Sequence, residues 1–336
     1  MKFAAVLMKY DYGNEKRGYS YEYINIFLPL MDILGESNLL HFDFYADFLR
    51  NGKEGMNKNL LGFFRGEKPD AALFCLFQEE LDEKTLESVR KNTKTLVYFF
   101  DDPWRQKFAR HWIKYFDYFS TPDYYMYRKY LSEGFKNVIY SPFGFNSGIY
   151  KKINLEKIYD VSFVGGYSPY RRWIIDMLKK EGIDVKVFGR DWGRNAWVSQ
   201  EDMVRIFNQS KINLNLSNGI SFDPAFLLHS IGSLKDIKQI LLLRKTKEQI
   251  KGRHYEINAC GGFQLSYFVP GLNLAYEIDK EIAVYEDPGN IADEIKFFIA
   301  EEALRNEIAE NGYKRSIKDH SAQNYLRKVI DKIFSN

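Results

Sequence analysis

The sequence predicts an α/β protein with two doubly wound domains, each built around a parallel sheet. Three observations support this fold class. The chain has 336 residues, which is enough for two domains of about 150 residues. Short apolar runs alternate with helical patterns along most of the chain, as they do in parallel sheets. A connection over residues 143–156, rich in glycine and mixed charge, separates two such series.

The first series begins with an apolar run over residues 3–8, followed by a glycine-containing loop and a helical stretch over residues 23–34. Strand, loop and helix in this order form the opening unit of a parallel sheet. We expect further strands at 41–44, 71–77, 95–100, 116–120 and 138–140, and helices at 79–91 and 122–132. These elements define an N-terminal Rossmann-like domain, residues 1–150.

The second series defines a C-terminal Rossmann-like domain, residues 151–318. We expect strands at 160–164, 185–188, 212–216 and 263–269, and helices at 171–181, 203–209 and 291–311, with the last helix stopping at Gly312. Residues 237–243 have the apolar character and length of a core segment. A final helix lies within residues 319–336. Ligands of such sheets bind beyond the carboxyl ends of the strands, so the expected site is a cleft between the two domains.

Composition argues against several classes of protein. The 48 basic and 45 acidic residues give a net charge of +3, and no basic block indicates nucleic-acid binding. No apolar stretch approaches the roughly 20 residues of a membrane span, and the N-terminal apolar run is too short for a signal peptide. No G-x-G-x-x-G follows the first strand, which argues against an oxidoreductase. Cys75 and Cys260 are expected to be buried thiols, as in a reducing cytoplasm.

Residues 251–262, which read K-G-R-H-Y-E-I-N-A-C-G-G, predict a brief helix that ends at a glycine pair before a buried strand. Main-chain N–H groups at its start and the cation Arg253 would suit a phosphate, and Glu256 would accept hydroxyl groups. This combination suggests a nucleoside diphosphate with a ribose or sugar attached. The alternative is a surface helix in which Arg253 and Glu256 pair at i, i+3. His254 is either a cleft residue or a buried structural histidine.

Other polar residues follow predicted strands of the C-terminal domain. Gly165 and Gly166 would let the backbone approach a ligand closely. Arg171 or Arg172, just beyond, could add a second phosphate clamp; the alternative is a helix-start turn followed by a solvated basic pair. Asn215 stands at the carboxyl end of a strand and either faces the cleft or belongs to an ordinary strand-end turn.

In the N-terminal domain, Asp101 and Asp102 follow a predicted strand. They could act as a general base or position an acceptor hydroxyl. Alternatively, they form an N-cap before Pro103, a favoured first helical residue. The pair is not the metal-binding Asp-x-Asp motif, and no His, Cys and Asp cluster has the spacing of metal ligands. We therefore expect no metal.

Four motifs occur in a characteristic order. They are D-V-S-F-V-G-G-Y from Asp160, the pair Arg171 and Arg172, V-F-G-R-D-W from Val187, and R-H-Y-E-I-N-A-C-G-G from Arg253. Together they resemble GT-B glycosyltransferases of the spore-maturation, CgeB-like type, over most of residues 95–330. The resemblance implies two Rossmann-like domains that face each other across a cleft, with the C-terminal helix packing back toward the N-terminal domain.

In that family, the C-terminal domain binds a nucleotide-sugar and the N-terminal domain receives the acceptor. The resemblance assigns the ribose hydroxyls to Glu256, and the diphosphate to Lys251 and Arg253, whose charge would stabilise the leaving nucleotide. Related retaining enzymes carry Glu-x7-Glu, and Glu248 stands eight residues before Glu256, here in T-K-E-Q-I-K rather than the usual Gly-Phe-Gly setting. Glu248 is therefore a candidate catalytic residue beside the two aspartates.

The implied activity is transfer of a hexosyl or related sugar from a nucleoside-diphosphate sugar, such as a UDP-sugar, to a glycan, lipid-linked or protein acceptor. It would need no metal or other cofactor and would serve polysaccharide biosynthesis in the cytoplasm, with peripheral membrane contact left open. One alternative is a nucleotide-sugar 2-epimerase, which would need several carboxylates and histidines around the sugar, whereas the five histidines are scattered. Another is a non-catalytic nucleotide- or carbohydrate-binding module.

Overall fold

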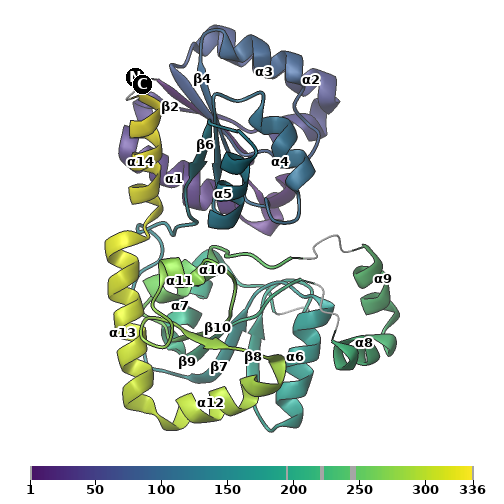
Figure 1. Cartoon of the computed structure of the whole chain (residues 1–336), viewed down its shortest axis with the longest axis vertical. Helices are drawn as coiled ribbons and strands as arrows, with labels where there is room; N and C mark the ends of the chain where they lie inside the picture. Colours follow the sequence, from purple (N-terminus) through teal and green to yellow (C-terminus); the bar gives the residue numbers. More distant parts are fainter. Residues whose placement is uncertain (1, 194–195, 220–222, 243–246, 335–336) are drawn as a thin grey trace. The chain divides into compact units, whose positions relative to one another are not determined.

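The computed structural model describes residues 2–193, 196–219, 223–242 and 247–334 (Figure 1). The chain forms two compact units. Unit 1 is Met1–Asn146 together with Ser321–Asn336, and unit 2 is Ser147–His320. These bounds differ by a few residues from the divisions at 150 and 318 that the sequence suggested.

Unit 1 contains a six-stranded parallel sheet with the strand order β2-β1-β3-β4-β5-β6. Its strands are β1 (Phe3–Val6), β2 (Leu39–Phe42), β3 (Ala71–Phe74), β4 (Lys94–Tyr98), β5 (Tyr118–Thr121) and β6 (Val138–Tyr140). Phe3 pairs with Leu39 on one side and Ala71 on the other. The strands are largely apolar because helices cover both faces of the sheet. Each strand predicted for the first series overlaps one of these strands.

One face of this sheet is covered by α1 (Leu28–Leu34), which continues a π-helical turn over Tyr23–Phe27, and by α14 (Ala322–Phe334). The two helices lie side by side (Figure 1). Leu326, Val329 and Ile333 of α14 are buried in the same core as residues of β1. The predicted return of the C-terminal helix to the N-terminal domain is therefore confirmed.

Four helices pack on the other face, and all four are labelled in Figure 1. They are α2 (Phe44–Glu67), α3 (Glu83–Arg90), α4 (Gln106–Ile113) and α5 (Tyr124–Ser132). The sequence pattern indicated α3 and α5 but not α2 or α4. Helix α2 contains four glycines and is interrupted at Gly52, where φ is +67°. Because glycine weakens a helix interior, the pattern of α2 resembles a loop.

Unit 2 contains a five-stranded parallel sheet with the order β11-β10-β9-β7-β8. Its strands are β7 (Tyr159–Val164), β8 (Val185–Phe188), β9 (Ser210–Asn215), β10 (Gln264–Tyr267) and β11 (Ala283–Tyr285). Its helices are α6 (Pro169–Lys180), α7 (Gln200–Gln209), α8 (Pro224–Ile231), α9 (Leu234–Leu242), α10 (Arg253–Ala259), α11 (Leu272–Ala275), α12 (Ile291–Ala300) and α13 (Glu302–Asp319). The predicted brief helix before the glycine pair is α10, and Gly261 has the positive φ, +68°, that this helix end requires.

Two expectations for unit 2 are wrong. Residues 237–242 are not a core segment, because they lie in α9, where Leu241 and Leu242 are 80% and 68% exposed; residue 243 lies outside the described residues. The single helix expected over 291–311 is two helices that meet at Glu301, and α13 continues through Gly312 to Asp319. Gly312 is therefore not a helix stop.

Gly312 permits a close approach between α13 and the loop before β11. A Cβ atom at this position would lie 2.2 Å from the carbonyl oxygen of Glu281. We expect Gly312→Ala to lower the free energy of unfolding by about 1–3 kcal/mol, as overpacking does. The matched control is Gly62→Ala in α2, where an added Cβ would contact nothing within 4 Å. That variant should gain about 0.5–1 kcal/mol. Urea denaturation measures both, and equal changes would contradict the close approach.

Candidate functional site

The carboxyl ends of the unit 2 strands meet at one edge of the sheet, and the strand order changes direction between β7 and β9. From β7 the chain adds β8 on one side, then β9, β10 and β11 on the other. Open parallel sheets bind ligands at such a switch point. Here Gly165 and Gly166 follow β7, while Leu216 and Ser217 follow β9.

Arg171 joins the two loops at the switch point. Its Nε donates to the carbonyl oxygens of Leu216 and Ser217, both at 3.1 Å, and its Nη1 donates to the carbonyl oxygen of Gly166 at 2.8 Å. Burial lowers the pKa of the guanidinium to about 10, so it stays charged at neutral pH. Most of the N–H groups of the Arg171 guanidinium therefore donate to main-chain oxygens. These hydrogen bonds fix the spacing of the two loops.

Glu248 and Lys251 both contact the loop that follows β9. One oxygen of Glu248, Oε1, accepts from the hydroxyl of Ser217 and from the N–H of Gly219, the latter at 2.7 Å. The other, Oε2, is buried and has no hydrogen-bond partner among the described residues. The ammonium of Lys251 donates to the side-chain oxygen of Asn218. The structure therefore brings a carboxylate and a cation together at the switch point.

Two buried tyrosines stand at the ends of neighbouring strands, and one of them contacts this segment. The hydroxyl of Tyr267, the last residue of β10, donates to the carbonyl oxygen of Gln249 at 3.1 Å. Tyr285, the last residue of β11, is buried, and its hydroxyl has no partner among the residues described. Burial raises the pKa of both hydroxyls, so they remain protonated. Sequence reasoning missed both tyrosines, although each ends an apolar run.

Arg253 and Glu256 form a pair inside unit 2. Nη1 of Arg253 donates to Oε2 of Glu256 at 2.7 Å, and the guanidinium lies over the ring of Phe207, 5.1 Å from its centroid. The side chain of Glu256 is 5% exposed. Burial first, and the Glu256 carboxylate second, raise the pKa of Tyr150 well above its ordinary value. The i, i+3 pair of the alternative interpretation is thus present, but α10 is buried and is not a surface helix.

The start of α10 uses most of its own main-chain donors. The N–H of Lys251 donates to Nδ1 of His254 at 3.1 Å, and the N–H of Glu256 donates to the carbonyl oxygen of Gly252 at 3.0 Å. His254 is fully buried, and burial lowers its pKa to about 3, so it is neutral. His254 therefore holds the turn before α10. Of the main-chain N–H groups that were predicted to bind phosphate at the start of this helix, those of Gly252 and Arg253 are the ones that remain candidates.

Two other predicted donor-site residues lie elsewhere. The guanidinium of Arg172 contacts Asp236 of α9 at 2.7 Å and Asp176 of α6 at 3.2 Å. Asn215 is buried within the sheet, where its Nδ2 donates to the hydroxyl of Ser266 on β10 at 3.2 Å. The predictions that these residues bind the donor therefore have no support from the positions of their side chains.

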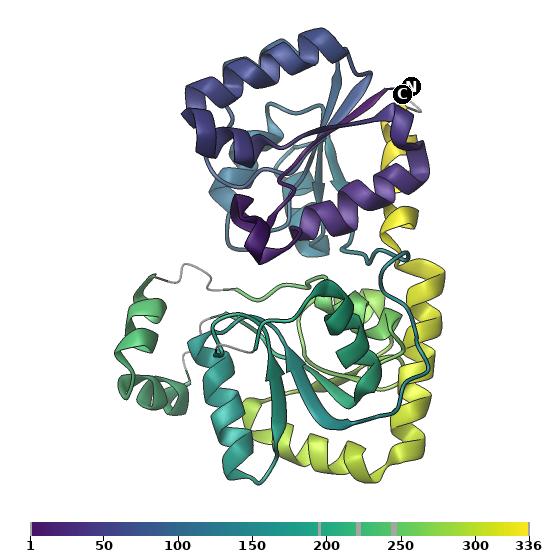
Figure 2. The ribbon, with the colours of Figure 1, turned by 180° about the vertical axis from the view of Figure 1, so that it is seen from behind.

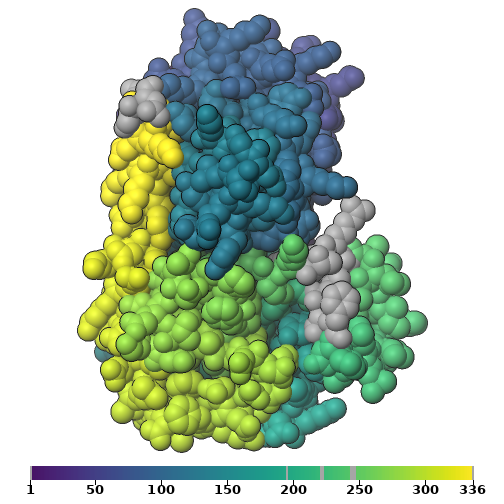
Figure 3. Space-filling model, viewed as in Figure 1, coloured from purple at the N-terminus to yellow at the C-terminus, as the bar shows by residue number. Residues whose placement is uncertain are grey.

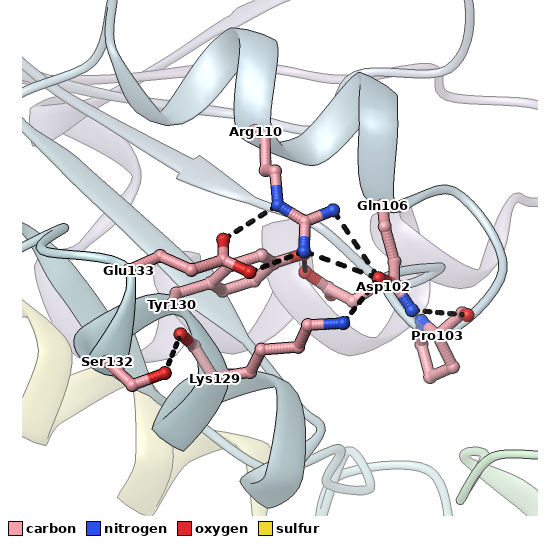
Figure 4. A network of polar contacts seen from close by, with 8 residues as sticks. All are labelled: Asp102, Pro103, Gln106, Arg110, Lys129, Tyr130, Ser132 and Glu133. Atoms are coloured by element: carbon pink, nitrogen blue, oxygen red, sulfur yellow. Dashed lines mark hydrogen bonds and ion pairs between the residues drawn. The ribbon is translucent and has the colours of Figure 1, made fainter.

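In unit 1, the two predicted catalytic aspartates lie differently. Asp102 is fully buried, and its Oδ1 accepts from the hydroxyl of Tyr130 at 3.0 Å (Figure 4). Burial raises the pKa of the Asp102 carboxyl well above its ordinary value. Asp101 is partly exposed and lies 3.9 Å from the guanidinium of Arg105. The N-cap alternative is wrong, because the next helix, α4, has Arg105 at its N-cap.

Figure 4 also shows the surface network beside Asp102. Arg110 of α4 binds the two carboxylate oxygens of Glu133 at 2.6 and 2.7 Å, and both Arg110 and Lys129 donate to the side-chain oxygen of Gln106. These contacts join α4 to α5 above the buried carboxyl. Asp102 is therefore a buried support of this loop and does not reach the surface.

Glu22 is a further titratable group that sequence reasoning did not single out. Burial, with smaller contributions from the carboxylates of Asp11 and Asp101, raises the pKa of Glu22 to about 7. The residue lies at the start of the helical segment before α1, so its acidic side chain resembles an ordinary helix-start residue in the sequence.

The raised pKa of Glu22 predicts a pH-dependent loss of stability. The folded protein holds this proton more tightly than the unfolded chain, so the stability falls as pH rises from about 4.5 through about 7. Glu22→Gln should remove this part of the slope, which amounts to about 3 kcal/mol at most. Unfolding free energies measured between pH 4.5 and 8 test this, with Glu36→Gln, an exposed acid on the same unit, as the control. An unchanged slope would contradict the assignment.

Three further properties concern the described residues alone. Both cysteines are buried and unpaired, as predicted. Within the described ranges, no helix has both the length and the apolar character needed to cross a bilayer. In the same part of the chain, His, Cys, Asp and Glu side chains form no group of three or more that could hold a metal ion.

Comparison with known proteins finds matches in sequence and in structure, several of them to glycosyltransferases. A family model described as glycosyl transferase-like matches residues 171–331. The spore protein CgeB of Bacillus subtilis is 24% identical over 246 residues, which cover 68% of this chain and 71% of CgeB. Two solved structures align over 100% of both chains: sucrose-phosphate synthase from Thermosynechococcus elongatus, with a TM-score of 0.66 and 10% identity, and Anabaena HepE in complex with UDP, with a TM-score of 0.60 and 12% identity. The structural likeness shows the fold.

Proposed function

We propose that this chain, which resembles the spore protein CgeB in sequence and has the fold of the GT-B glycosyltransferases, transfers a sugar from a nucleoside-diphosphate sugar bound at the carboxyl edge of the unit 2 sheet. Glycosyl transfer is the function that its family match and its fold support. The proposed nucleotide is UDP, since HepE was solved with UDP. The proposed acceptor is a glycan, a lipid-linked sugar or a protein.

The proposal rests on one observation: the side chains of Glu248 and Lys251 both contact the loop that follows β9. Breaking the bond between a sugar and a diphosphate develops negative charge on the leaving phosphate and positive charge on the sugar. Lys251 would stabilise the first charge and Glu248 the second. Oε1 of Glu248 is held by Ser217 and Gly219, while the buried Oε2 has no hydrogen-bond partner among the described residues and is the proposed acceptor for a sugar hydroxyl. Fixed charges of this kind support a reaction that needs no metal.

The other proposed roles follow from position. Gly166 and Arg171 shape the backbone that would approach the diphosphate, with Arg171 as a positioning residue. Glu256 is proposed to accept the ribose hydroxyls, and Arg253 to hold its carboxylate in place. In unit 1, Asp101 is the proposed contact for the acceptor hydroxyl, because it is the partly exposed member of the aspartate pair.

Lys251→Ala tests the diphosphate assignment. A hydrogen bond to a charged group contributes about 1.5–3 kcal/mol, so the Kd for UDP should rise by roughly 10-fold to 150-fold. Calorimetric titration of UDP measures this. Lys211→Ala is the matched control, since Lys211 pairs with Asp160 at the opposite end of the strands. An unchanged Kd in Lys251→Ala would remove the lysine from the site.

Turnover distinguishes the proposal from its alternatives. Incubation with a panel of nucleotide-sugars should release the free nucleoside diphosphate as the sugar passes to the hydroxyl of an added acceptor or, more slowly, to water. A binding module would release none, and a 2-epimerase would convert the sugar while it is still attached to the nucleotide. Either outcome would contradict glycosyl transfer.

A further inference from the structure

Helices α8 and α9 form a hairpin that projects from one side of unit 2, beside α6 (Figures 1 and 2). Figure 3 shows the same hairpin as a green lobe on the surface. It is inserted between the end of β9 and the segment that carries Glu248 and Lys251. We refer to α8 and α9 together as the hairpin, residues 224–242.

The inner side of the hairpin is anchored to α6 and the loop before it. Phe226 is 1% exposed and packs against the rings of Tyr170 and Trp173. Asp236 is fully buried, where it accepts from the hydroxyl of Tyr167 and contacts the guanidinium of Arg172 at 2.7 Å. The hairpin is therefore held in one orientation, and its outer side is a defined surface.

That outer side is apolar. In α8, Leu228 and Ile231 are 72% and 67% exposed; in α9, Leu234, Leu241 and Leu242 are 87%, 80% and 68% exposed. The exposed positions recur at helical spacing, so each helix presents one stripe to solvent. A soluble surface helix normally has the opposite arrangement, with its apolar stripe inward. An exposed apolar patch of this kind marks an interaction surface.

The charge on the same face is positive. The only acidic residue of the hairpin, Asp236, is buried and paired with Arg172. Lys235 and Lys238 are both exposed. Lys238 lies on the stripe of α9 that runs from Leu234 to Leu241, whereas the ammonium of Lys235 lies at the edge of the stripe, 3.8 Å from the centroid of the Tyr167 ring. Leucines flanked by lysines on one helical face are typical of helices that lie in the surface of a membrane, with the apolar side chains in the acyl boundary and the lysines at anionic head groups.

We propose that the hairpin docks this protein onto an anionic lipid surface. A second copy of the chain fits the same face less well. A symmetric dimer would bring the patch against itself, and Lys235 and Lys238 would meet the same lysines with no exposed hairpin acid to balance them. The inference rests on the hairpin alone and holds whether or not the proposed donor site is correct.

Vesicle sedimentation tests the proposal on the full chain. The probes are vesicles of phosphatidylcholine alone and of phosphatidylcholine with phosphatidylglycerol. We expect most of the protein to pellet with the anionic vesicles at 0.1 M NaCl, and little of it with the neutral vesicles or at 0.5 M NaCl, where charge is screened. Equal binding to both vesicles, or no binding to anionic ones, would overturn the proposal.

Two variants locate the surface. Leu228→Ser combined with Leu234→Ser should weaken partitioning by at least about tenfold, because two apolar side chains no longer enter the acyl boundary. Lys238→Gln should weaken binding to anionic vesicles only. The matched control is Leu49→Ser combined with Ile158→Ser, whose side chains are 57% and 54% exposed elsewhere on the chain.

The variants also distinguish lipid from protein as the occupant. All of them should keep the melting temperature and the release of nucleoside diphosphate from donor, since these side chains lie outside the proposed donor site. A control that loses binding as much as the leucine variant would overturn the proposal. So would a wild-type dimer, seen by light scattering, that dissociates in the leucine variant while vesicles bind neither protein.

Discussion

Glu248→Gln is expected to lower the turnover number by about 100-fold to 1,000-fold, the usual effect of removing one fixed electrostatic contact to a transition state. Glutamine has nearly the same shape and can still accept from Ser217 and Gly219, the partners of Oε1. What it lacks is the negative charge that, in the proposed mechanism, would stabilise the positive charge developing on the sugar. Steady-state release of nucleoside diphosphate from the donor measures the loss, and the affinity for the nucleotide should change much less than turnover.

The control for this variant is Glu201→Gln, an exposed acid at the start of α7 on the same unit. Its turnover should match the wild type. A Glu248→Gln protein with wild-type turnover would exclude the carboxylate from the reaction, and a parallel loss in melting temperature would indicate that the residue acts only through folding.

Arg253→Ala is expected to lower the free energy of unfolding by about 3–5 kcal/mol, because it leaves a buried carboxylate without its ion-pair partner. The side chains of Arg253 and Glu256 are 24% and 5% exposed and lie 2.7 Å apart. From the sequence alone, loss of this arginine would weaken nucleotide binding with little effect on folding. The buried setting changes that expectation, since the pair is also part of the core. Chemical denaturation measures the loss.

An exposed pair with the same i, i+3 spacing serves as the control. Lys280 and Glu277 are 69% and 59% exposed, and Lys280→Ala should leave the free energy of unfolding almost unchanged because an exposed ion pair contributes little. Adding Glu256→Gln to Arg253→Ala should restore part of the loss, because the unpaired charge is removed. A loss in Arg253→Ala no larger than in Lys280→Ala would show that the pair is not buried in solution.

The positions of β1 to β10 could be inferred from the sequence because each is a short apolar run, as a sheet covered on both faces requires. The order of the strands within each sheet was not predicted, because it depends on pairing between segments that are distant along the chain. The hairpin of α8 and α9 could not be predicted from the sequence. Leu241 and Leu242 follow the apolar Ile237 and Ile240, and hydropathy alone does not distinguish an outward stripe from a core segment. The continuation of α13 past Gly312 accompanies close packing against the loop before β11, which leaves no local signal in the sequence. At the break, Arg305 of α13 donates to the carbonyl oxygens of Phe298 and Ile299 at the end of α12.

Some residues of the candidate site could likewise be predicted from the sequence, and others could not. Glu248 and Lys251 could be singled out because their spacing and charge carry chemical meaning, and the structure places both on one loop. Arg171 and Arg172 are neighbours in sequence, yet α6 directs one toward the loops after β7 and β9 and the other toward Asp236. The burial of Asp102 depends on Tyr130, which is 28 residues away along the chain.

A crystal structure of the protein with UDP tests the central claim most directly. We expect the pyrophosphate beyond the carboxyl ends of β7 and β9, within hydrogen-bond distance of Nζ of Lys251, with the ribose toward Glu256. UDP bound elsewhere on the chain, or bound at this edge with the Lys251 side chain turned to solvent, would contradict the proposed donor site.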